Sequence, residues 1–222
     1  KFFFKKLLPS IFSSGITQIN ILIGTIIASF ETGAVSYLYY ADRIYQINLA
    51  IAGIAIGTVA LPELSKRIKN KNFDSVMNIQ NKSLELCLLL SLPACFGLII
   101  ASEEIVNALF GYGSFSRENV MITAKALKYF GFGVPAFALI KVLSNFLFAR
   151  DNTKVPLYIS TFIVFLNIGI SLIYLQEIGF VIIPIATSIS TWIGVVIYSI
   201  LLIKFKYFSF ESTFFVNLLK VV

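Results

Sequence analysis

The chain has 222 residues, of which 58% are hydrophobic and only 13% are charged, and its formal net charge is +7. This composition excludes an ordinary soluble domain, in which about a quarter of the residues are charged. The apolar runs have the length of membrane helices, about 20 residues, rather than the roughly ten-residue alternating segments of an outer-membrane barrel. The sequence therefore predicts an all-α polytopic membrane protein.

Apolar runs between helix breakers predict six membrane-spanning helices. The predicted spans are 9–30, 35–63, 80–102, 121–149, 155–176 and 179–203. Together they form one six-helix unit over residues 1–208, and residues 209–222 resemble a linker followed by the start of a further helix. Because the chain begins without an initiator methionine and stops within an apolar run, we expect a piece of a longer protein.

The charges of the predicted loops alternate in sign. Basic connections follow the second and fourth spans and contain Lys66, Arg67, Lys69, Lys71, Arg150 and Lys154. Acidic connections follow the first, third and fifth spans and contain Glu31, Glu103, Glu104, Glu118 and Glu177. Because short loops rich in lysine and arginine stay in the cytoplasm, both ends of the unit are predicted to be cytoplasmic. The dispersed cations favour this topology signal over nucleic-acid binding.

Little in the chain favours covalent or metal chemistry. It has no histidine, and its two cysteines, Cys87 and Cys95, lie about 12 Å apart along one predicted helix, too far for a disulfide within that helix. The sequence contains no zinc-ligand pattern and no nucleophile paired with a base. We therefore expect neither a cofactor nor enzyme activity.

The second span contains the stretch "YYADRIYQIN", which places two charges in an apolar segment. At 100° per residue, one stripe about 80° wide collects Tyr39, Arg43, Gln46, Ala50, Gly53 and Gly57, with Ile47, Ile51 and Ile54 beside it. A charge near the bilayer centre is costly and usually faces a bundle interior or a wet cavity, so Arg43 is predicted to point inward. Snorkelling of Arg43 to the headgroups is the alternative.

Three further features of this stripe bear on its role. Asp42 lies off the stripe, which leaves Arg43 without an evident partner, and a guanidinium group suits phosphate oxygens well. Gln46 extends the polar face by one turn, and Gly53 and Gly57 allow another helix to approach closely. The stripe therefore predicts a site for an anionic ligand.

Other polar residues within the spans are less informative. Lys141 lies about two turns inside the fourth span, where a structural cation, snorkelling and a ligand contact all remain open. Asn20, Asn167 and Ser171 are typical of hydrogen bonds between membrane helices. Thr187 can bond to its own helix backbone.

The second span and its flanks resemble a known family. "VSYLYYADRIYQINLAIAGIAIGTVALPELSKRI" is similar to the second helix of the carboxy-terminal lobe in the MviN/MurJ lipid II flippases, of the multidrug/oligosaccharidyl-lipid/polysaccharide exporter superfamily. "QINILIGTIIASF" before it, and "ALFGYGSFS" and "KVLSNFLFARDNTKVP" after it, fit the family's order and spacing. The resemblance implies two six-helix lobes around a central cavity, with this chain as the second lobe. It also implies a bacterial inner-membrane protein that flips lipid II by alternating access, with lipid II, membrane lipids and the amino-terminal lobe as partners.

The resemblance also implies roles for individual residues. The family arginine that matches Arg43 lines the cavity and is implicated in recognising the diphosphate of the undecaprenyl-linked precursor. Gln46 stands where some relatives have glutamate, which puts an acid/base role there in doubt. Asn48 and Ala50 stand where many members have proline and glycine, which predicts a straighter second helix.

Some members of this family bind sodium between the helices that correspond to the first, fifth and sixth spans. Asn167 and Thr187 match two of the ligand positions, whereas Gly24 and Ser171 stand at the carboxylate positions. Because a hard cation prefers oxygen ligands that include carboxylates, the resemblance predicts weak or absent sodium binding here.

Three alternatives to a lipid II flippase remain open. One is an exporter of another polyprenyl-linked saccharide, and a second is a drug antiporter. An antiporter is expected to carry a carboxylate within the membrane, and Asp42 and Glu85 lie near the ends of their spans. The third is a membrane scaffold for cell-wall enzymes that does not transport.

Overall fold

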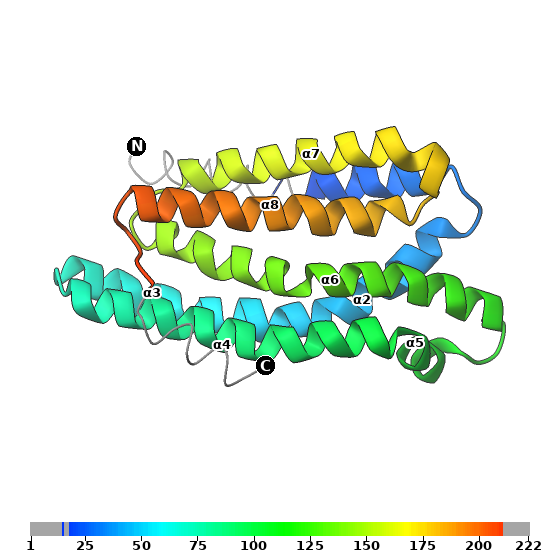
Figure 1. Cartoon of the computed structure of the whole chain (residues 1–222), viewed down its shortest axis with the longest axis horizontal. Helices are drawn as coiled ribbons and strands as arrows, with labels where there is room; N and C mark the ends of the chain where they lie inside the picture. Colours follow the sequence, from blue (N-terminus) through cyan, green and yellow to red (C-terminus); the bar gives the residue numbers. More distant parts are fainter. Residues whose placement is uncertain (1–14, 16–17, 211–222) are drawn as a thin grey trace.

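The computed structural model describes residue 15 and residues 18–210, and the regular elements of this part are all helices (Figure 1). They are an apolar helix Gln18–Ala28, α2 Ala34–Leu49, the π-helix η1 Ala50–Ala55, α3 Ile56–Lys69, α4 Phe73–Ile100, α5 Ser102–Phe110, α6 Arg117–Phe148, α7 Lys154–Ile178 and α8 Ile182–Lys204. Helices α2, η1 and α3 follow one another without a break over 36 residues.

Five helices in the described part are long and apolar enough to cross a membrane: Ala34–Lys69, α4, α6, α7 and α8. They coincide with the predicted second to sixth spans. The predicted first span lies partly outside the described residues, and its described part is the shorter helix Gln18–Ala28. The predicted linker and further helix after residue 208 lie almost entirely outside them. The count of six spans therefore stays a prediction.

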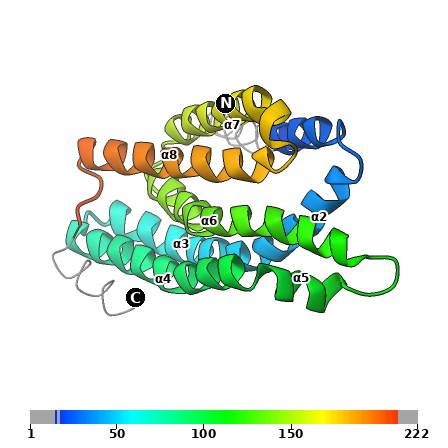
Figure 2. The same ribbon diagram turned by 45° about the vertical axis from the view of Figure 1, so that its right-hand side comes forward.

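Two local features depart from the sequence-based expectations. The third span ends at Ile100, and a separate nine-residue helix, α5, follows it where only a loop was expected. The second span, expected to be straighter than in its relatives, contains η1, in which the turns are wider than in an α-helix. Figure 2 shows the chain changing direction between α2 and α3.

Helix α6 is the centre of the bundle. It packs against α8, α4, α2 and α5. Figure 1 shows α7 and α8 on one side of it and α3 and α4 on the other. Small residues on α6, among them Gly131, Ala136 and Ala138, allow its neighbours to approach closely. Since α6 contacts helices from both sides of the bundle, it holds the layers of the lobe together.

The two ends of the bundle differ in their balance of charge. We call the end where α3, α6 and α8 finish the basic end, and the other the acidic end. The last turn of α3 carries Lys66, Arg67 and Lys69, and that of α8 carries Lys204. The first turns of α5 and α6 carry Glu103, Glu104 and Glu118. This difference agrees with the alternating loops of the sequence, and the assignment of the basic end to the cytoplasm stays a prediction.

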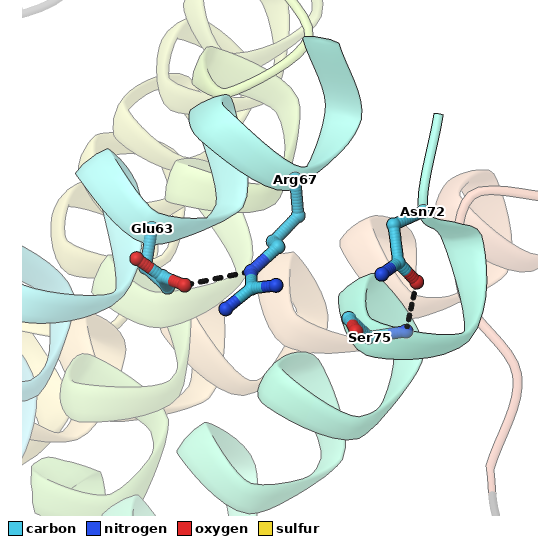
Figure 3. A network of polar contacts seen from close by, with 4 residues as sticks. All are labelled: Glu63, Arg67, Asn72 and Ser75. Atoms are coloured by element: carbon cyan, nitrogen blue, oxygen red, sulfur yellow. Dashed lines mark hydrogen bonds and ion pairs between the residues drawn. The ribbon is translucent and has the colours of Figure 1, made fainter. Parts of the chain in front are cut away.

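The turn between α3 and α4 at the basic end has well-defined polar contacts (Figure 3). Arg67 donates from Nε to Oε1 of Glu63, one helical turn earlier, at 2.8 Å. The side chain of Asn72 caps α4 by accepting a hydrogen bond from the backbone N–H of Ser75 at 3.2 Å. The charge of Arg67 is therefore matched on its own helix.

Candidate functional site

Arg43 lies on the surface of the lobe. It is exposed, and its guanidinium group stands 4.6 Å over the centre of the Tyr39 ring, one turn earlier on α2. Such a contact at an exposed site is worth about 0.5–1 kcal/mol. Within the described residues, no carboxylate lies within ion-pair distance of Arg43. The fork of this arginine therefore remains available, and Tyr39, which belongs to the predicted stripe, packs against it.

Gln46 does not simply continue the polar face of Arg43. Its side-chain amide donates a hydrogen bond to Oδ2 of Asp42, and both residues are partly buried. Positions i and i+4 face each other on a helix, so this pairing follows directly from their spacing. Asp42 lies off the predicted stripe, so the stripe did not predict its contact with Gln46.

The predicted stripe divides at the π-helix. Arg43 and Ala50 are exposed, whereas Gly53 and Gly57 are buried. The stripe was drawn at 100° per residue throughout, but the wider turn of η1 rotates the residues that follow it. The neighbouring Ile47, Ile51 and Ile54 are exposed, as a lipid-facing or lobe-facing surface requires.

Both glycines lie against α6. A Cβ atom added to Gly53 would stand 3.0 Å from the backbone Cα of Ala138. One added to Gly57 would stand 2.5 Å from Nδ2 of Asn145, which is the mobile end of a side chain. The geometry requires a residue without a side chain most strictly at Gly53, because the opposing atom there belongs to the backbone.

Gly53→Ala is therefore expected to lower the free energy of unfolding by about 1–3 kcal/mol, the usual cost of overpacking. Gly57→Ala is expected to cost less, since the Asn145 amide can move aside. Gly97→Ala in α4 is the control, because a Cβ there meets no atom within 4 Å and alanine favours a helix. Thermal unfolding of the full-length protein in detergent measures all three. Equal stabilities of the Gly53 and Gly97 variants would contradict the close approach.

Lys141 is exposed on α6 and lies far from Arg43 along the bundle. Its carbonyl oxygen faces Gly57, at 3.9 Å from a Cβ built there. Gly57 is 14 residues beyond Arg43, which corresponds to about 20 Å of helix axis. The structure therefore does not bring the two predicted cationic ligands to one point.

Asn167 and Thr187 do meet, at a buried polar cluster between three helices. Asn167 donates from Nδ2 to Oδ1 of Asn20 at 2.9 Å, and its own Oδ1 accepts long hydrogen bonds of 3.5 Å from Ser171 and Thr187. Thr187 also bonds to the carbonyl of Ile183 at 2.7 Å. No carboxylate takes part among the described residues, which also hold no group of three or more metal-binding His, Cys, Asp or Glu side chains.

A network around Arg150 at the basic end was not predicted. Arg150 donates to the carbonyls of Phe146 and Tyr207, both at 2.8 Å, and stands 4.6 Å over the Tyr207 ring. Gln80, which is fully buried, accepts from Arg150 Nη1 at 3.1 Å and donates to the same Tyr207 carbonyl at 3.0 Å. Burial lowers the pKa of Arg150 from its ordinary value, but that value is so high that the group stays protonated. From the sequence, Arg150 was predicted only to be one of the cations of a basic loop.

Comparisons with known proteins agree with this architecture. The family model described as lipid II flippase MurJ matches residues 1–222. A probable lipid II flippase MurJ of Rickettsia prowazekii is 42% identical over 192 residues, which are 85% of this chain and 38% of that relative. One of Rhizobium meliloti is 42% identical over 187 residues, covering 84% of this chain and 35% of that relative. The chain thus spans well under half the length of these relatives.

Solved structures show the same fold. A lipid II flippase MurJ in an inward closed conformation is 29% identical, with a TM-score of 0.83 over 96% of this chain and 44% of that chain. An outward-facing multidrug resistance MATE family transporter of the MOP superfamily, at 17% identity, has a TM-score of 0.78 over 96% of this chain and 49% of its own. The fold is that of MOP superfamily transporters, and by its family match the chain belongs to the lipid II flippase MurJ family.

Proposed function

We propose that this chain is the carboxy-terminal lobe of a transporter that flips lipid II by alternating access. The single observation that carries the proposal is the exposed guanidinium group of Arg43, which stands over Tyr39 and has no carboxylate of the described residues within ion-pair distance. An arginine fork binds phosphate oxygens through two parallel hydrogen bonds, so it suits the diphosphate of a polyprenyl-linked precursor. The relatives named lipid II flippases are more than twice as long as the matched region, so the activity belongs to a longer protein.

The chain is part of a multi-pass protein of the bacterial inner membrane, by its family and its five membrane-length helices. In the proposed mechanism the headgroup of lipid II enters a cavity between two lobes, and rocking of the lobes exposes it first to one side and then to the other. Arg43 contributes part of the diphosphate clamp. Lys141, at a different depth, would contact another part of the substrate or another state of the cycle. In the same mechanism the second span and α6, which approach closely at Gly53, move as one body.

Complementation tests the proposed function. The full-length gene is expressed in a bacterium whose own lipid II flippase is depleted. A flippase restores growth, whereas an exporter of another saccharide, a drug antiporter or a scaffold does not. Binding of lipid II to the purified protein, with undecaprenyl diphosphate as competitor, distinguishes a transporter from a scaffold. A transporter binds lipid II, whereas a scaffold that binds only other proteins does not. Failure of growth despite normal amounts of protein in the membrane would contradict the proposal.

We also propose that sodium does not couple transport through the Asn167 cluster, because its ligands are neutral. Ser171→Asp places a carboxylate beside Asn167 and is expected to create a sodium dependence, since carboxylate oxygens are preferred by hard cations. The measurement is the midpoint of thermal unfolding of the full-length protein in sodium chloride and in potassium chloride. We expect a higher midpoint in sodium for the Ser171→Asp variant and equal midpoints for the wild type and for the Ser171→Asn control. A sodium-dependent wild type would refute the proposal.

A further inference from the structure

The basic end contains a cavity that the transport proposal does not use. Its volume is about 350 Å³, and it lies between the end of α3, the start of α4 and the segment that follows α8. Phe73, Val76 and Met77 contribute apolar side chains to its lining, and Arg150, Lys206 and Tyr207 line it as well. The cavity therefore combines an apolar surface with two cations.

The cations of this cavity keep hydrogen-bonding capacity for a ligand. A guanidinium group has five N–H donors. Three of those of Arg150 are engaged by the carbonyls of Phe146 and Tyr207 and by Gln80, which leaves two. Lys206 is exposed, and within the described part of the chain no carboxylate reaches ion-pair distance of it. Arg150 is held in place by these hydrogen bonds and lines the cavity.

The backbone at Lys206 is unusual and has a close counterpart. Lys71, Asp151 and Lys206 have positive φ angles of 55°, 58° and 57°. Each ends a helix, and the next residue closes the turn by donating to a carbonyl five residues back: Asn72 to Arg67, Asn152 to Leu147 and Tyr207 to Leu202. Glycine is the usual residue in this left-handed position, because it has no Cβ penalty there. Two lysines thus occupy equivalent backbone positions, and only Lys206 lines the cavity.

The surroundings of the cavity are positively charged. The exposed cations of the basic end are Lys66, Lys69, Lys71, Lys154, Lys204 and Lys206. The nearby acids are Asp74, Asp151 and Glu63, and the last of these is matched by Arg67 (Figure 3). An anion is therefore favoured at this end of the bundle over a cation or a neutral ligand.

We propose that this cavity binds an anionic phospholipid, with the phosphate at Lys206 and the free donors of Arg150 and an acyl chain along Phe73 and Met77. Basic pockets between membrane helices near the membrane surface suit such headgroups. The apolar part of the lining favours a lipid over free phosphate, which would leave that surface bare. The site is separate from Arg43, near the opposite end of the second span, and the inference stands independently of the transport substrate.

The test uses full-length protein in detergent and measures lipid binding by native mass spectrometry with dioleoylphosphatidylglycerol. One cation near a membrane surface contributes about 1 kcal/mol, so Lys206→Gly is expected to weaken binding about fivefold. Lys71→Gly is the matched control, since it removes the same charge from the same backbone conformation outside the cavity and is expected to leave affinity unchanged. Both variants should fold, because glycine suits both positions.

A second variant tests the apolar part of the lining. Met77→Trp fills part of the cavity without changing charge and is expected to weaken phosphatidylglycerol binding as well. Dioleoylphosphatidylcholine and inorganic phosphate are expected to bind at least tenfold more weakly than phosphatidylglycerol. Equal losses in the Lys206 and Lys71 variants would overturn the site, because they would indicate a diffuse electrostatic attraction. Equally tight binding of phosphatidylcholine or of inorganic phosphate would overturn it too.

Discussion

Arg43→Ala is expected to weaken the binding of lipid II to the full-length protein about 30-fold or more. The substitution removes a two-pronged, charge-assisted contact with the diphosphate, and hydrogen bonds to charged groups contribute about 1.5–3 kcal/mol each. A loss of about 2 kcal/mol corresponds to about 30-fold in affinity. Because Arg43 is exposed, the fold is expected to survive the change.

Two further variants show whether charge or geometry matters at this position. Arg43→Lys keeps the charge but loses the planar fork, so we expect it to recover only part of the affinity. Arg67→Ala is the control, since it also removes one arginine but one that is matched by Glu63 at the basic end. Isothermal titration of purified lipid II into detergent-solubilised protein gives the dissociation constants. If the Arg43→Ala variant bound lipid II as tightly as the wild type, Arg43 would not be part of the binding site.

Arg150→Leu is expected to lower the free energy of unfolding by about 2–4 kcal/mol. The change leaves the side-chain oxygen of the fully buried Gln80 and the carbonyl of Phe146 without their donor. A buried polar group without a partner costs about 1–3 kcal/mol. The substitution also removes the hydrogen bond from Arg150 to the Tyr207 carbonyl, which connects the end of α6 to the segment after α8.

Thermal unfolding of the full-length protein in detergent measures this loss. Lys154→Ala, an exposed cation four residues later, is the control and is expected to change stability by less than about 0.5 kcal/mol. Arg150→Lys should recover little, because one ammonium group cannot reach carbonyls on both sides. If Arg150→Leu were as stable as the Lys154 control, the network would not hold the basic end together.

The sequence predicted the long helices well, for a clear physical reason. Each membrane-length helix needs about 20 apolar residues, and the loops between them carry charges, so runs such as the one within α8 stand out against their flanks. The family resemblance is confirmed by the match over residues 1–222. The short helix α5 was missed because nine residues produce no membrane-length signal and "EEIVNALF" can also be read as a loop.

The site was only partly predictable, because the faces of the second span were predicted from an ideal α-helix of 100° per residue. The exposed position of Arg43 depends on which face of α2 packs against α6, and no residue pattern in the sequence marks the π-helix, in which Gly53 lies against Ala138. The hydrogen bond from Gln46 to Asp42 could have been found from their i, i+4 spacing. The contacts of Arg150 join residues up to 70 positions away, such as Gln80, and no local pattern marks them.

The most direct test of the account is the export of lipid II itself. In cells depleted of their own flippase, the full-length protein is expressed as wild type or as Arg43→Ala, at matched amounts in the membrane. The measured quantity is the fraction of lipid II that becomes accessible at the outer face of the inner membrane. The account predicts that the wild type restores export and that the accessible fraction of lipid II is at least tenfold lower with Arg43→Ala. Equal export by the two proteins would contradict a role of Arg43 in holding the diphosphate.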